Sequence, residues 1–335
     1  MSLDVVGLGN AIMDALVRIE DDALIGDLGL TRGQMHPVNH ARWHEVYNRV
    51  KQFGVEVHSG GSCANAMATA ALLGGKVLYC GQVGDDRFGE LYAESLIASC
   101  GDHRLHVEQG AVTGKCLSLI SRRDGERTML TDLGSAIELH EIGSFIGHIQ
   151  HARVFHLTGY KFLGGPVRDA AYRALAVAQA AQVPISIDLA DPFVARNIRD
   201  EMEAVLRKYA TIAFLNREEA EAMTGLGAVA ALEVLEQWVD VVVVKLGSEG
   251  SLVRRRGQTW KIPVFPARVM DTTGAGDSYA GAFLYAWSRG LALPYCGELG
   301  SRVAALTVGQ VGAVCRDREA LAGALTALNL PGDEA

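Results

Sequence analysis

The feature that most constrains the fold is a series of short apolar runs that alternate with helical stretches. The runs read as strands at 77–84 (VLYCGQVG), 154–159 (VFHLTG), 185–190 (ISIDLA), 212–216 (IAFLN) and 241–247 (VVVVKLG). Helices are expected between them, for example near 86–99 and 166–182. Strands that are apolar at nearly every position suit a parallel sheet covered by helices on both faces. The sequence therefore predicts an α/β fold with a doubly wound, mostly parallel sheet, which binds ligands beyond the carboxyl ends of its strands.

Two segments, 12–38 and 111–133, interrupt this alternation and look β-rich. In the second, two strand-like runs flank Arg123-Asp124-Gly125, and Asp-Gly supplies the positive φ that a tight hairpin turn needs. We predict one large domain over 1–335 in which these segments form a small β-sheet lid. The alternative is that these segments are surface insertions without a functional role, but long insertions in compact domains tend to be functional.

Composition excludes several classes of protein. The chain has 335 residues and a net charge of -8, which argues against a nucleic-acid binder. No apolar run reaches the roughly 18 residues of a membrane span. The six cysteines are scattered without a C-x-x-C pair, so reduced thiols are favoured over a zinc site or disulfides. Because the N-terminal segment passes into a strand without a signal-peptide core, we expect a cytoplasmic protein.

Two glycine motifs give weak signals. Gly7-x-Gly9 follows a strand and invites a dinucleotide-binding interpretation, but Ile12 stands at the third glycine position and 12–19 looks like a strand. A nicotinamide dehydrogenase is therefore a distant alternative. The stretch 110–116 (GAVTGKC) is not a P-loop, because Cys116 stands where Ser or Thr would bind magnesium. His40 and His44, at i, i+4 spacing, lack further ligands and are better explained as a solvated helix face.

The stretch HSGGSCANAMATAALLGG (58–75) is more informative. Gly60 and Gly61 form a flexible turn, Ser62 is a candidate N-cap, and a small-residue, buried helix follows. Asn65 then lies in the first helical turn, where asparagine is common as a capping or solvated residue. The functional interpretation is that Asn65 and the glycine backbone bind the hydroxyl groups of a ligand.

The most specific stretch is DTTGAGD (271–277), which precedes an apolar helix. The backbone amides of Gly274, Ala275 and Gly276 lie at a helix N-terminus, where they can surround an anion such as a transferring phosphoryl group. Asp277 can then accept the proton of an attacking hydroxyl, the base that phosphoryl transfer needs. The alternative is that Asp277 is an ordinary first-turn carboxylate, favoured by the helix dipole.

These motifs together resemble those of the PfkB-type carbohydrate kinases, also called the ribokinase family. DTTGAGD with its helix is similar to the C-terminal signature, and GGSCAN with GQVGDDRFGE (81–90) is similar to the N-terminal one. The resemblance covers nearly the whole chain in the expected order. It implies a ribokinase-like fold and an ATP-dependent, magnesium-assisted kinase that phosphorylates a hydroxyl group.

Within the family, GLGNAIMD (7–14) most resembles the bacterial adenosine kinases. The resemblance implies that Arg127, in GERTM, lies near the transferred phosphate and that Tyr160, in GYKF, stacks on the base. An aromatic ring with apolar walls suits a purine, although each wall residue could equally belong to the lid core. The implied acceptor site comprises Asn10, Ile12, Asp14, Gly60, Gly61, Asn65, Leu119, Met129 and Tyr160.

The resemblance also implies an ATP site and two ion sites. The N-x-x-E pair Asn216 and Glu219 is expected to handle Mg²⁺ through water, and Asp271 with Thr273 is the expected K⁺ site. Relatives often have Thr at Lys245 and Asn or His at Ser301, so contacts there differ. The implied ATP-binding residues are Asn216, Glu219, Lys245, Gly247, Gly250, Thr272, Gly274, Gly276, Ser301 and Gly312.

We therefore expect a kinase that converts ATP and adenosine to ADP and AMP, with Asp277 as general base for the 5′-hydroxyl. One alternative is a kinase of ribose, of fructose, or of inosine, guanosine or cytidine. Another is a non-catalytic nucleotide- or nucleoside-binding protein on the same fold. The partners expected are small molecules, and the protein is either a monomer or a homodimer joined through the lid.

Overall fold

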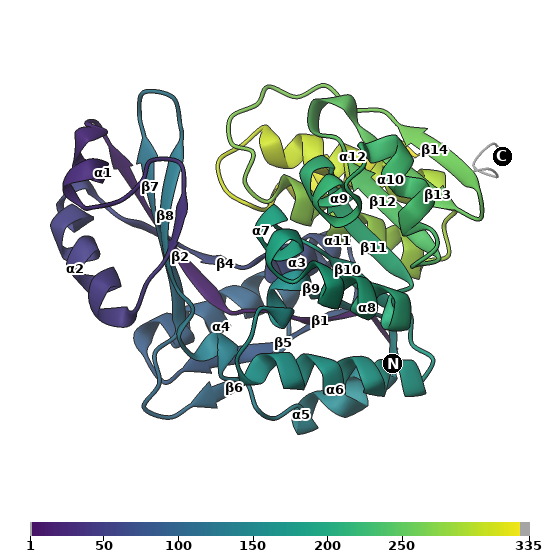
Figure 1. Cartoon of the computed structure of the whole chain (residues 1–335), viewed down its shortest axis with the longest axis horizontal. Helices are drawn as coiled ribbons and strands as arrows, with labels where there is room; N and C mark the ends of the chain where they lie inside the picture. Colours follow the sequence, from purple (N-terminus) through teal and green to yellow (C-terminus); the bar gives the residue numbers. More distant parts are fainter. Residues whose placement is uncertain (1, 329–335) are drawn as a thin grey trace.

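The computed structural model describes residues 2–328 and contains two β-sheets, a large one and a small one (Figure 1). The large sheet has nine strands in the order β14-β13-β12-β11-β10-β9-β1-β5-β6. The run from β12 to β6 is parallel, and β13 and β14 add an antiparallel edge. Its strands are β1 (Leu3–Leu8), β5 (Val77–Gly84), β6 (His103–Glu108), β9 (Ala152–Thr158), β10 (Ile185–Asp188), β11 (Ile212–Asn216), β12 (Val241–Lys245), β13 (Ser251–Arg255) and β14 (Gln258–Ile262).

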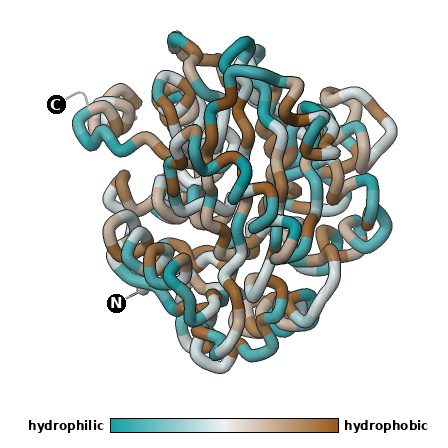
Figure 2. Tube along the Cα trace, turned by 90° about the vertical axis from the view of Figure 1, so that its left-hand side faces the viewer, coloured by the Kyte–Doolittle hydropathy of each residue, from teal (hydrophilic) through white to brown (hydrophobic). Residues whose placement is uncertain are grey.

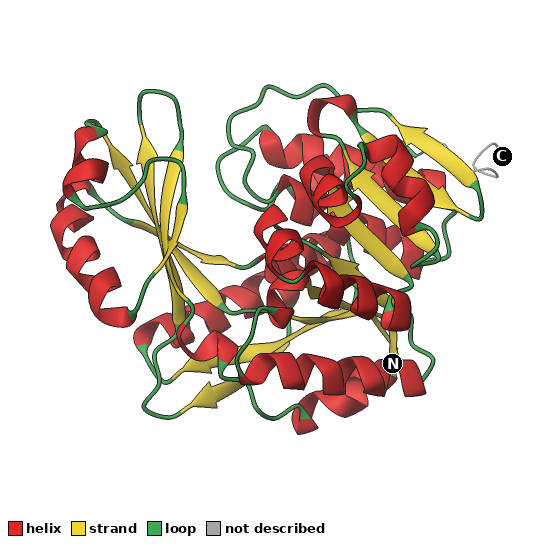
Figure 3. Cartoon of the chain, viewed as in Figure 1, coloured by secondary structure: helices red, strands yellow, loops and turns green. Residues whose placement is uncertain are grey.

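Helices cover both faces of the large sheet (Figure 3). One face packs against α5 (Gly143–Gln150), α6 (Pro166–Ala180), α7 (Pro192–Asn197), α8 (Arg199–Tyr209), α9 (Arg217–Thr224) and α10 (Ala228–Leu235). The other packs against α3 (Ser62–Leu72), α4 (Arg87–Cys100), α11 (Ala275–Ser288), α12 (Leu293–Val308) and α13 (Arg318–Thr326). Short 3₁₀ turns lie at Lys51–Phe53, Gly134–Ile137, Gly159–Phe162 and Gly247–Glu249.

The central strands are apolar because both of their faces are buried. In β12, Val242 and Val244 belong to one hydrophobic core, and Val241 and Val243 belong to the core on the opposite face. Successive side chains of a strand point to opposite faces, so a run of valines fills both cores at once. This is the physical reason why uninterrupted apolar runs identified these strands.

The small sheet has five strands in the order β3-β8-β7-β2-β4. It pairs β2 with β7 and β3 with β8 in parallel, and the other neighbours are antiparallel. Its edges, which a lid-mediated homodimer would use, are β3 and β4. The strands are β2 (Ile12–Ile19), β3 (Met35–Pro37), β4 (Glu56–Gly60), β7 (Gly114–Ser121) and β8 (Arg127–Asp132).

Only one face of the small sheet packs against helices of its own. Its core contains Trp43 and Val46 of α2 (His40–Val50), Ile25 of α1 (Ala23–Asp27) and alternate residues of β2 and β7. Figure 2 views the molecule from this side and shows hydrophobic and hydrophilic residues interleaved along the chain. In β2 the burial of successive residues alternates, as expected for a sheet with one apolar face and one mixed face.

The predicted fold class is confirmed, with differences in detail. The hairpin between β7 and β8 turns where expected, and Gly125 has φ +76°. The segment 12–38, expected to be β-rich, also includes the helix α1. The small sheet also contains β4, of which only Gly60 was assigned in advance, to a turn. Over residues 2–328, no helix has the length and apolarity to cross a membrane.

Candidate active site

A cavity of about 730 Å³ lies between the small sheet and the carboxyl ends of strands in the large sheet. Segments that follow β1, β9 and β10 form one wall, and the uncovered face of the small sheet forms another. This position fits the rule that open α/β sheets bind ligands beyond the carboxyl ends of their strands. The predicted site residues that line it are Asn10, Ile12, Asp14, Gly61, Asn65, Arg127, Met129, Tyr160, Thr273, Gly274, Asp277 and Gly312.

Asp277 and Asn65, which are far apart in the sequence, meet at this cavity. The Asn65 Nδ2 group donates a hydrogen bond to Asp277 Oδ2 at 2.8 Å. Asp277 lies in the first turn of α11, and Asn65 lies in the first turn of α3. The two helices pack closely because Gly281 of α11 faces the backbone of Ala66, where a Cβ would not fit. The N-cap of α3 is Gly61, with φ +96°, and not Ser62 as expected.

Asp277 is placed to act as a base rather than only as a helix cap. Its side chain forms no cap with its own helix, and it lines the cavity. Burial raises the pKa of Asp277, while the hydrogen bond from Asn65 opposes that rise. A carboxylate with a raised pKa holds a transferred proton more readily, which favours general-base chemistry.

Asp14 faces the same cavity from the small sheet. Burial raises the pKa of Asp14 to about 7, with Arg127 opposing the shift and Asp277 adding to it. The Asp14 carboxylate fills the space where a Cβ of Gly60 would lie, which explains the glycine there. Gly60 itself does not line the cavity, so its contribution is to leave room for Asp14. Asp14 can therefore accept hydrogen bonds from hydroxyl groups of a ligand.

The expected apolar wall is partly right and partly wrong. Ile12 and Met129 line the cavity as expected. Leu119 does not: it is fully buried on the opposite face of the small sheet, in the core with Trp43. Side chains alternate along β7, so Cys116 and Ser118 face the cavity in place of Leu119. The assignment of Leu119 to the acceptor site is thus corrected.

Tyr160 borders the cavity in the 3₁₀ turn that follows β9. Its hydroxyl donates to Asp191 Oδ2 at 2.8 Å. The other oxygen of Asp191 caps α7 by accepting from the backbone N–H of Phe193 at 2.7 Å. Phe193, 41% exposed, also lines the cavity. The two rings give this end of the cavity an aromatic character.

Arg127 joins the small sheet to the loop before α11. Its Nη2 group lies 3.3 Å from both carboxylate oxygens of Asp271. Asp271 also accepts from the backbone N–H of Thr273 at 3.0 Å and of Gly312 at 3.1 Å. Although burial opposes it, these hydrogen bonds and Arg127 hold the pKa of Asp271 below its usual value. The pairing places the Arg127 guanidinium at the mouth of the glycine-rich loop.

The N-terminus of α11 has the predicted glycine-rich geometry. Gly274 is the N-cap with φ +71°, and a Cβ there would collide with the backbone of Ala313. The amide of Ala275 donates to the carbonyl of Thr272, an exposed residue, at 3.3 Å, so it is not free for an anion. Gly274 lines the cavity, while Ala275 and Gly276 lie just behind it. The anion hole expected from three amides thus reduces to those of Gly274 and Gly276.

Lys245 brings a cation next to this helix end. Its Nζ atom lies 2.8 Å from Asp188 Oδ2 and 3.2 Å from where a Cβ of Gly276 would be. Although burial opposes it, the neighbouring carboxylates of Asp188 and Glu219 raise the pKa of Lys245, which therefore stays charged. Lys245 is in position to contact a phosphate held at the start of α11.

Asn216 and Glu219 form a capping box at the start of α9. The Asn216 side chain accepts from the backbone N–H of Glu219 at 2.8 Å, and Glu219 Oε2 accepts from the backbone N–H of Asn216 at 2.8 Å. Burial raises the pKa of Glu219. Both carboxylate oxygens already accept hydrogen bonds from Asn216. Direct ligation of a metal by Glu219 would break this box, so a contact through water fits better.

The remaining predicted ATP-binding residues lie in three separate places: the turn between β12 and β13, the main cavity and the helix α12. Gly247 and Gly250, with φ +62° and +89°, shape the turn between β12 and β13. Gly312 lines the main cavity. Ser301 is buried in α12 and donates to the carbonyl of Pro263 at 2.6 Å. No cluster of three or more His, Cys, Asp or Glu side chains suited to a metal occurs within residues 2–328.

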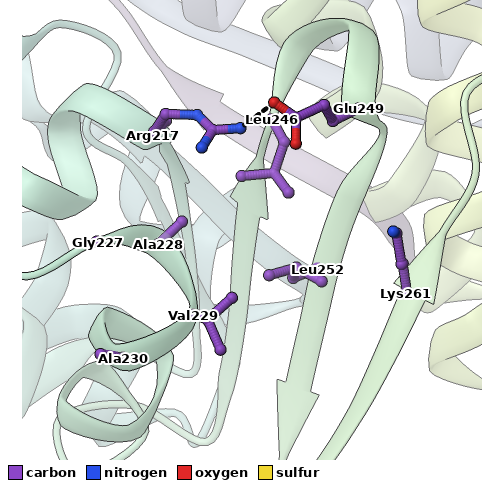
Figure 4. A pocket seen from close by; sticks show the side chains of 9 residues that line it. All are labelled: Arg217, Gly227, Ala228, Val229, Ala230, Leu246, Glu249, Leu252 and Lys261. Atoms are coloured by element: carbon purple, nitrogen blue, oxygen red, sulfur yellow. Dashed lines mark hydrogen bonds and ion pairs between the residues drawn. The ribbon is translucent and has the colours of Figure 1, made fainter.

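A second cavity, of about 520 Å³, lies beside the β12–β13 turn (Figure 4). Arg217 and Glu249 form an ion pair of 2.6 Å at its rim, and Val229, Leu246 and Leu252 line it. It contains none of the predicted site residues. The expected acceptor site and Asp277 therefore lie at the larger cavity, whereas Asn216, Glu219 and Lys245 line neither of the two cavities.

Sequence reasoning missed several polar residues of the site. Asp188, which pairs with Lys245, was interpreted only as part of a strand, and Asp191, which accepts from Tyr160, was not interpreted at all. Their signal was available, because carboxylates directly after a buried parallel strand lie at the ligand-binding edge of a sheet. Lys161, next to Tyr160, was also overlooked, although a lysine inside an apolar segment is unusual.

Comparison with known proteins identifies the family of this chain. The family model described as "pfkB family carbohydrate kinase" matches residues 35–318. Adenosine kinase of Saccharomyces cerevisiae is 27% identical over 93% of this chain and 96% of its own length.

Two solved structures superpose over nearly the whole chain. An adenosine kinase from Sinorhizobium meliloti has a TM-score of 0.89 and 31% identity, covering 98% of this chain and 100% of its own. A probable sugar kinase protein from Rhizobium etli CFN 42 has a TM-score of 0.90 and 28% identity, covering 98% of this chain and 99% of its own. The ribokinase-like fold is thereby confirmed, and the similarity extends to relatives of both substrate classes.

Proposed function

Because the chain belongs to the PfkB family of carbohydrate kinases, we propose that it phosphorylates the primary hydroxyl of a nucleoside, and that adenosine is the acceptor. Kinases of this family are phosphotransferases that act on hydroxyl groups, and this chain is one of them. The single observation that carries the hydroxyl-kinase chemistry is the Asp277–Asn65 pair, which faces a cavity with Asp14 on its opposite wall. The choice of a nucleoside rests on the aromatic end of that cavity.

Three features support a purine nucleoside over a simple sugar. Ile12 and Met129 give the cavity apolar walls, and Tyr160 and Phe193 border one end with aromatic rings. Its volume of about 730 Å³ exceeds what a single sugar ring needs. The Sinorhizobium meliloti relative, an adenosine kinase, is 31% identical.

In the proposed reaction, Asp277 accepts the proton of the 5′-hydroxyl as that oxygen attacks the γ-phosphorus of ATP. A bond forms between the acceptor oxygen and phosphorus, and the bond to the β–γ bridging oxygen breaks, which releases ADP. The amides of Gly274 and Gly276 and the side chain of Arg127 stabilise the charge on the transferring group. Asp14 accepts hydrogen bonds from the sugar hydroxyls and orients the acceptor. The small sheet acts as a lid that excludes water from this space.

Mg²⁺, when bound with ATP, neutralises phosphate charge. The residues present fit an ion held mainly by phosphate and water, because the Glu219 carboxylate is engaged in its capping box. Glu219 and Asn216 would orient the water shell of the ion. A K⁺ site at Asp271 and Thr273 stays a prediction, since the Asp271 carboxylate accepts hydrogen bonds from Thr273, Gly312 and Arg127.

The test is ADP release from Mg-ATP, with potassium present, across adenosine, inosine, guanosine, cytidine, ribose and fructose. We expect release with adenosine. Release with ribose or fructose alone would overturn the nucleoside assignment and leave the kinase mechanism standing. If no acceptor gives ADP, calorimetric titration with ATP and adenosine separates a non-catalytic binder from a kinase of an acceptor outside the panel.

A sugar is the second candidate acceptor. The similarity to the probable sugar kinase from Rhizobium etli, at 28% identity over 98% of this chain, favours it. Asp14 and Asp277 would serve a sugar as well as a nucleoside, because both bind hydroxyl groups. The two candidates therefore differ only at the aromatic end of the cavity.

A further inference from the structure

Lys161 is fully buried and directly follows Tyr160, which lines the acceptor cavity. Lysine is among the residues most rarely buried, because an ammonium group loses its hydration there. Burial lowers the pKa of Lys161 to about 7. A lysine kept in this environment calls for a role that an apolar side chain could not fill.

The partner of Lys161 is Asn10, which lines the acceptor cavity. Lys161 Nζ donates to Asn10 Oδ1 at 2.7 Å. Asn10 follows β1 and Lys161 follows β9, and these two strands are neighbours in the large sheet. The hydrogen bond therefore links two adjacent strand ends directly beneath the cavity.

This hydrogen bond determines which end of the Asn10 amide faces the ligand. A side-chain amide has an oxygen that accepts and a nitrogen that donates, whereas an ammonium group only donates. In the structure Asn10 presents Oδ1 to Lys161, so its Nδ2 group is turned away from Lys161. In the described part of the chain, Asn10 Nδ2 makes no hydrogen bond of its own.

Two other polar side chains that line the cavity, Asp14 and Asp277, have the opposite character. Asp14 and Asp277 are carboxylates, which accept hydrogen bonds when ionised. A sugar hydroxyl can satisfy a carboxylate, because it can donate. An unprotonated ring nitrogen or a ring oxygen cannot form a hydrogen bond with a carboxylate, because both groups only accept. Such an atom needs a donor, for example Asn10 Nδ2.

We propose that Lys161 is a positioning residue that fixes the Asn10 amide with its N–H group toward the cavity. The cavity then selects a substrate that carries a hydrogen-bond acceptor, a ring nitrogen or ring oxygen, opposite Asn10. This inference rests on the proposed function and adds a determinant of substrate choice to it. Lys161 need not touch the substrate, because it acts through Asn10.

The test compares adenosine with analogues that each lack one acceptor atom: 1-deaza-, 3-deaza- and 7-deazaadenosine and the carbocyclic analogue. The wild-type protein should bind one analogue about tenfold or more weakly than adenosine, as the loss of one hydrogen bond predicts. The Lys161→Met variant should bind adenosine about tenfold more weakly than the wild-type protein does. In this variant, the ratio of the Kd for the discriminated analogue to the Kd for adenosine should fall below about three. The KM for ATP should stay within about twofold of the wild-type value.

This readout separates positioning from general damage to the fold. A variant that only loses stability would weaken adenosine and all of its analogues alike, and the wild-type preference would survive. Full preference in a folded Lys161→Met protein, or no preference in the wild-type protein, would overturn the inference. Failure of the wild-type protein to bind adenosine at all would instead overturn the proposed function.

Two further variants keep the test decisive if Lys161→Met does not fold. Asn10→Asp still accepts from Lys161 but offers no N–H group, so it should melt like the wild type and lose the preference between adenosine and the analogue. Lys161→Arg retains donors and should recover part of the preference. Retained preference in Asn10→Asp would contradict the inference.

A double variant tests whether the two residues act as one unit. Adding Lys161→Met to Asn10→Asp should not weaken the binding of adenosine any further.

Discussion

The large sheet and the small sheet contribute to the active site in different ways. Helices cover both faces of the large sheet, so its strands are filled with core residues, and its chemistry comes from the segments after them, such as Asn10 and Tyr160. The small sheet has an uncovered face, so residues within its strands, such as Asp14 and Met129, line the cavity.

This difference explains which sequence patterns carried information. A strand buried on both faces is apolar throughout and easily recognised, but says nothing about ligands. In a strand with one face on a cavity, successive residues alternate between the hydrophobic core and the cavity. The residues on one face are therefore core residues, and those on the other are site residues. Cys116 and Leu117, adjacent in β7, belong to these two classes. The predictions that follow perturb one region at a time.

The largest expected effect comes from Asp277→Asn, in the first turn of α11. Loss of the base should lower kcat by about 10³-fold, within the range of general-base contributions. Because the asparagine still accepts from Asn65, the Kd for adenosine should change by less than about threefold. Single-turnover kinetics and calorimetry measure the two quantities. A variant that keeps more than a tenth of the wild-type kcat would contradict the role of Asp277.

The second effect comes from Asp14→Asn, on the small sheet. Replacement of an ionised acceptor of sugar hydroxyls should lower kcat/KM for the acceptor by about 10- to 100-fold, in line with hydrogen bonds to charged groups. The KM for ATP should not change. Equal losses for acceptor and ATP would show that Asp14 acts on the fold and not on the acceptor.

The same variant should be more stable than the wild type at high pH. The pKa of Asp14 is raised from 3.8 to about 7, so between these values the folded protein binds more protons than the unfolded chain. Stability then falls as pH rises through this window and stays low above it. Asp14→Asn should raise Tm by about 3 °C at pH 8 and by less at pH 5, as thermal melts at the two pH values would measure. An equal change at both would contradict the raised pKa.

Met129→Ala and Leu119→Ala compare the two faces of the small sheet directly. Met129 lines the cavity, so its truncation should raise the acceptor KM about tenfold with little change in stability. Leu119 is fully buried, so its truncation should lower the free energy of unfolding by about 3 kcal/mol. Urea denaturation and acceptor kinetics on both variants provide the check. If Met129→Ala lowered stability and Leu119→Ala raised the acceptor KM, the two faces of the small sheet would be assigned wrongly.

The smallest effect is expected at the second cavity, beside the β12–β13 turn. Arg217 pairs with Glu249, and the side chains are 48% and 68% exposed. Arg217→Gln should change the free energy of unfolding by no more than about 0.5 kcal/mol, as for other exposed pairs. Acceptor kinetics should stay within about twofold. A large loss of acceptor affinity would place the acceptor in this cavity instead.

The parts of this molecule that could be predicted from sequence are those with strong local signals. The apolar strands followed from runs that a single chain displays, and the presence of Asn65 and Asp277 in one site was implied by the resemblance to the PfkB-type kinases, whereas their hydrogen bond was not predicted. The strand β4 (EVHSG) could not be recognised, because it is a mostly exposed edge strand without an apolar face. The face taken by Leu119 had a local signal that the assignment did not use, because Leu117 and Leu119 alternate with Ser118 and so share one face of β7.

The pairing of polar side chains beneath the site could not be predicted from sequence, although the position of Asp188 at a strand end carried a signal. Asp188 pairs with Lys245, 57 residues away, and Lys161 pairs with Asn10, 151 residues away. Such pairs form only when the sheet order brings separate strand ends together. A sequence gives the order of the strands along the chain, but their order in the sheet comes from packing.

The central claim is that the two sheets hold one acceptor between them, with its primary hydroxyl at Asp277. A crystal structure with adenosine and a non-hydrolysable ATP analogue tests this most directly. The account predicts that the 5′-oxygen lies within about 3 Å of an Asp277 oxygen and that Asp14 contacts the ribose. Adenosine bound elsewhere, such as beside Arg217, or with its 5′-oxygen turned away from Asp277, would contradict it.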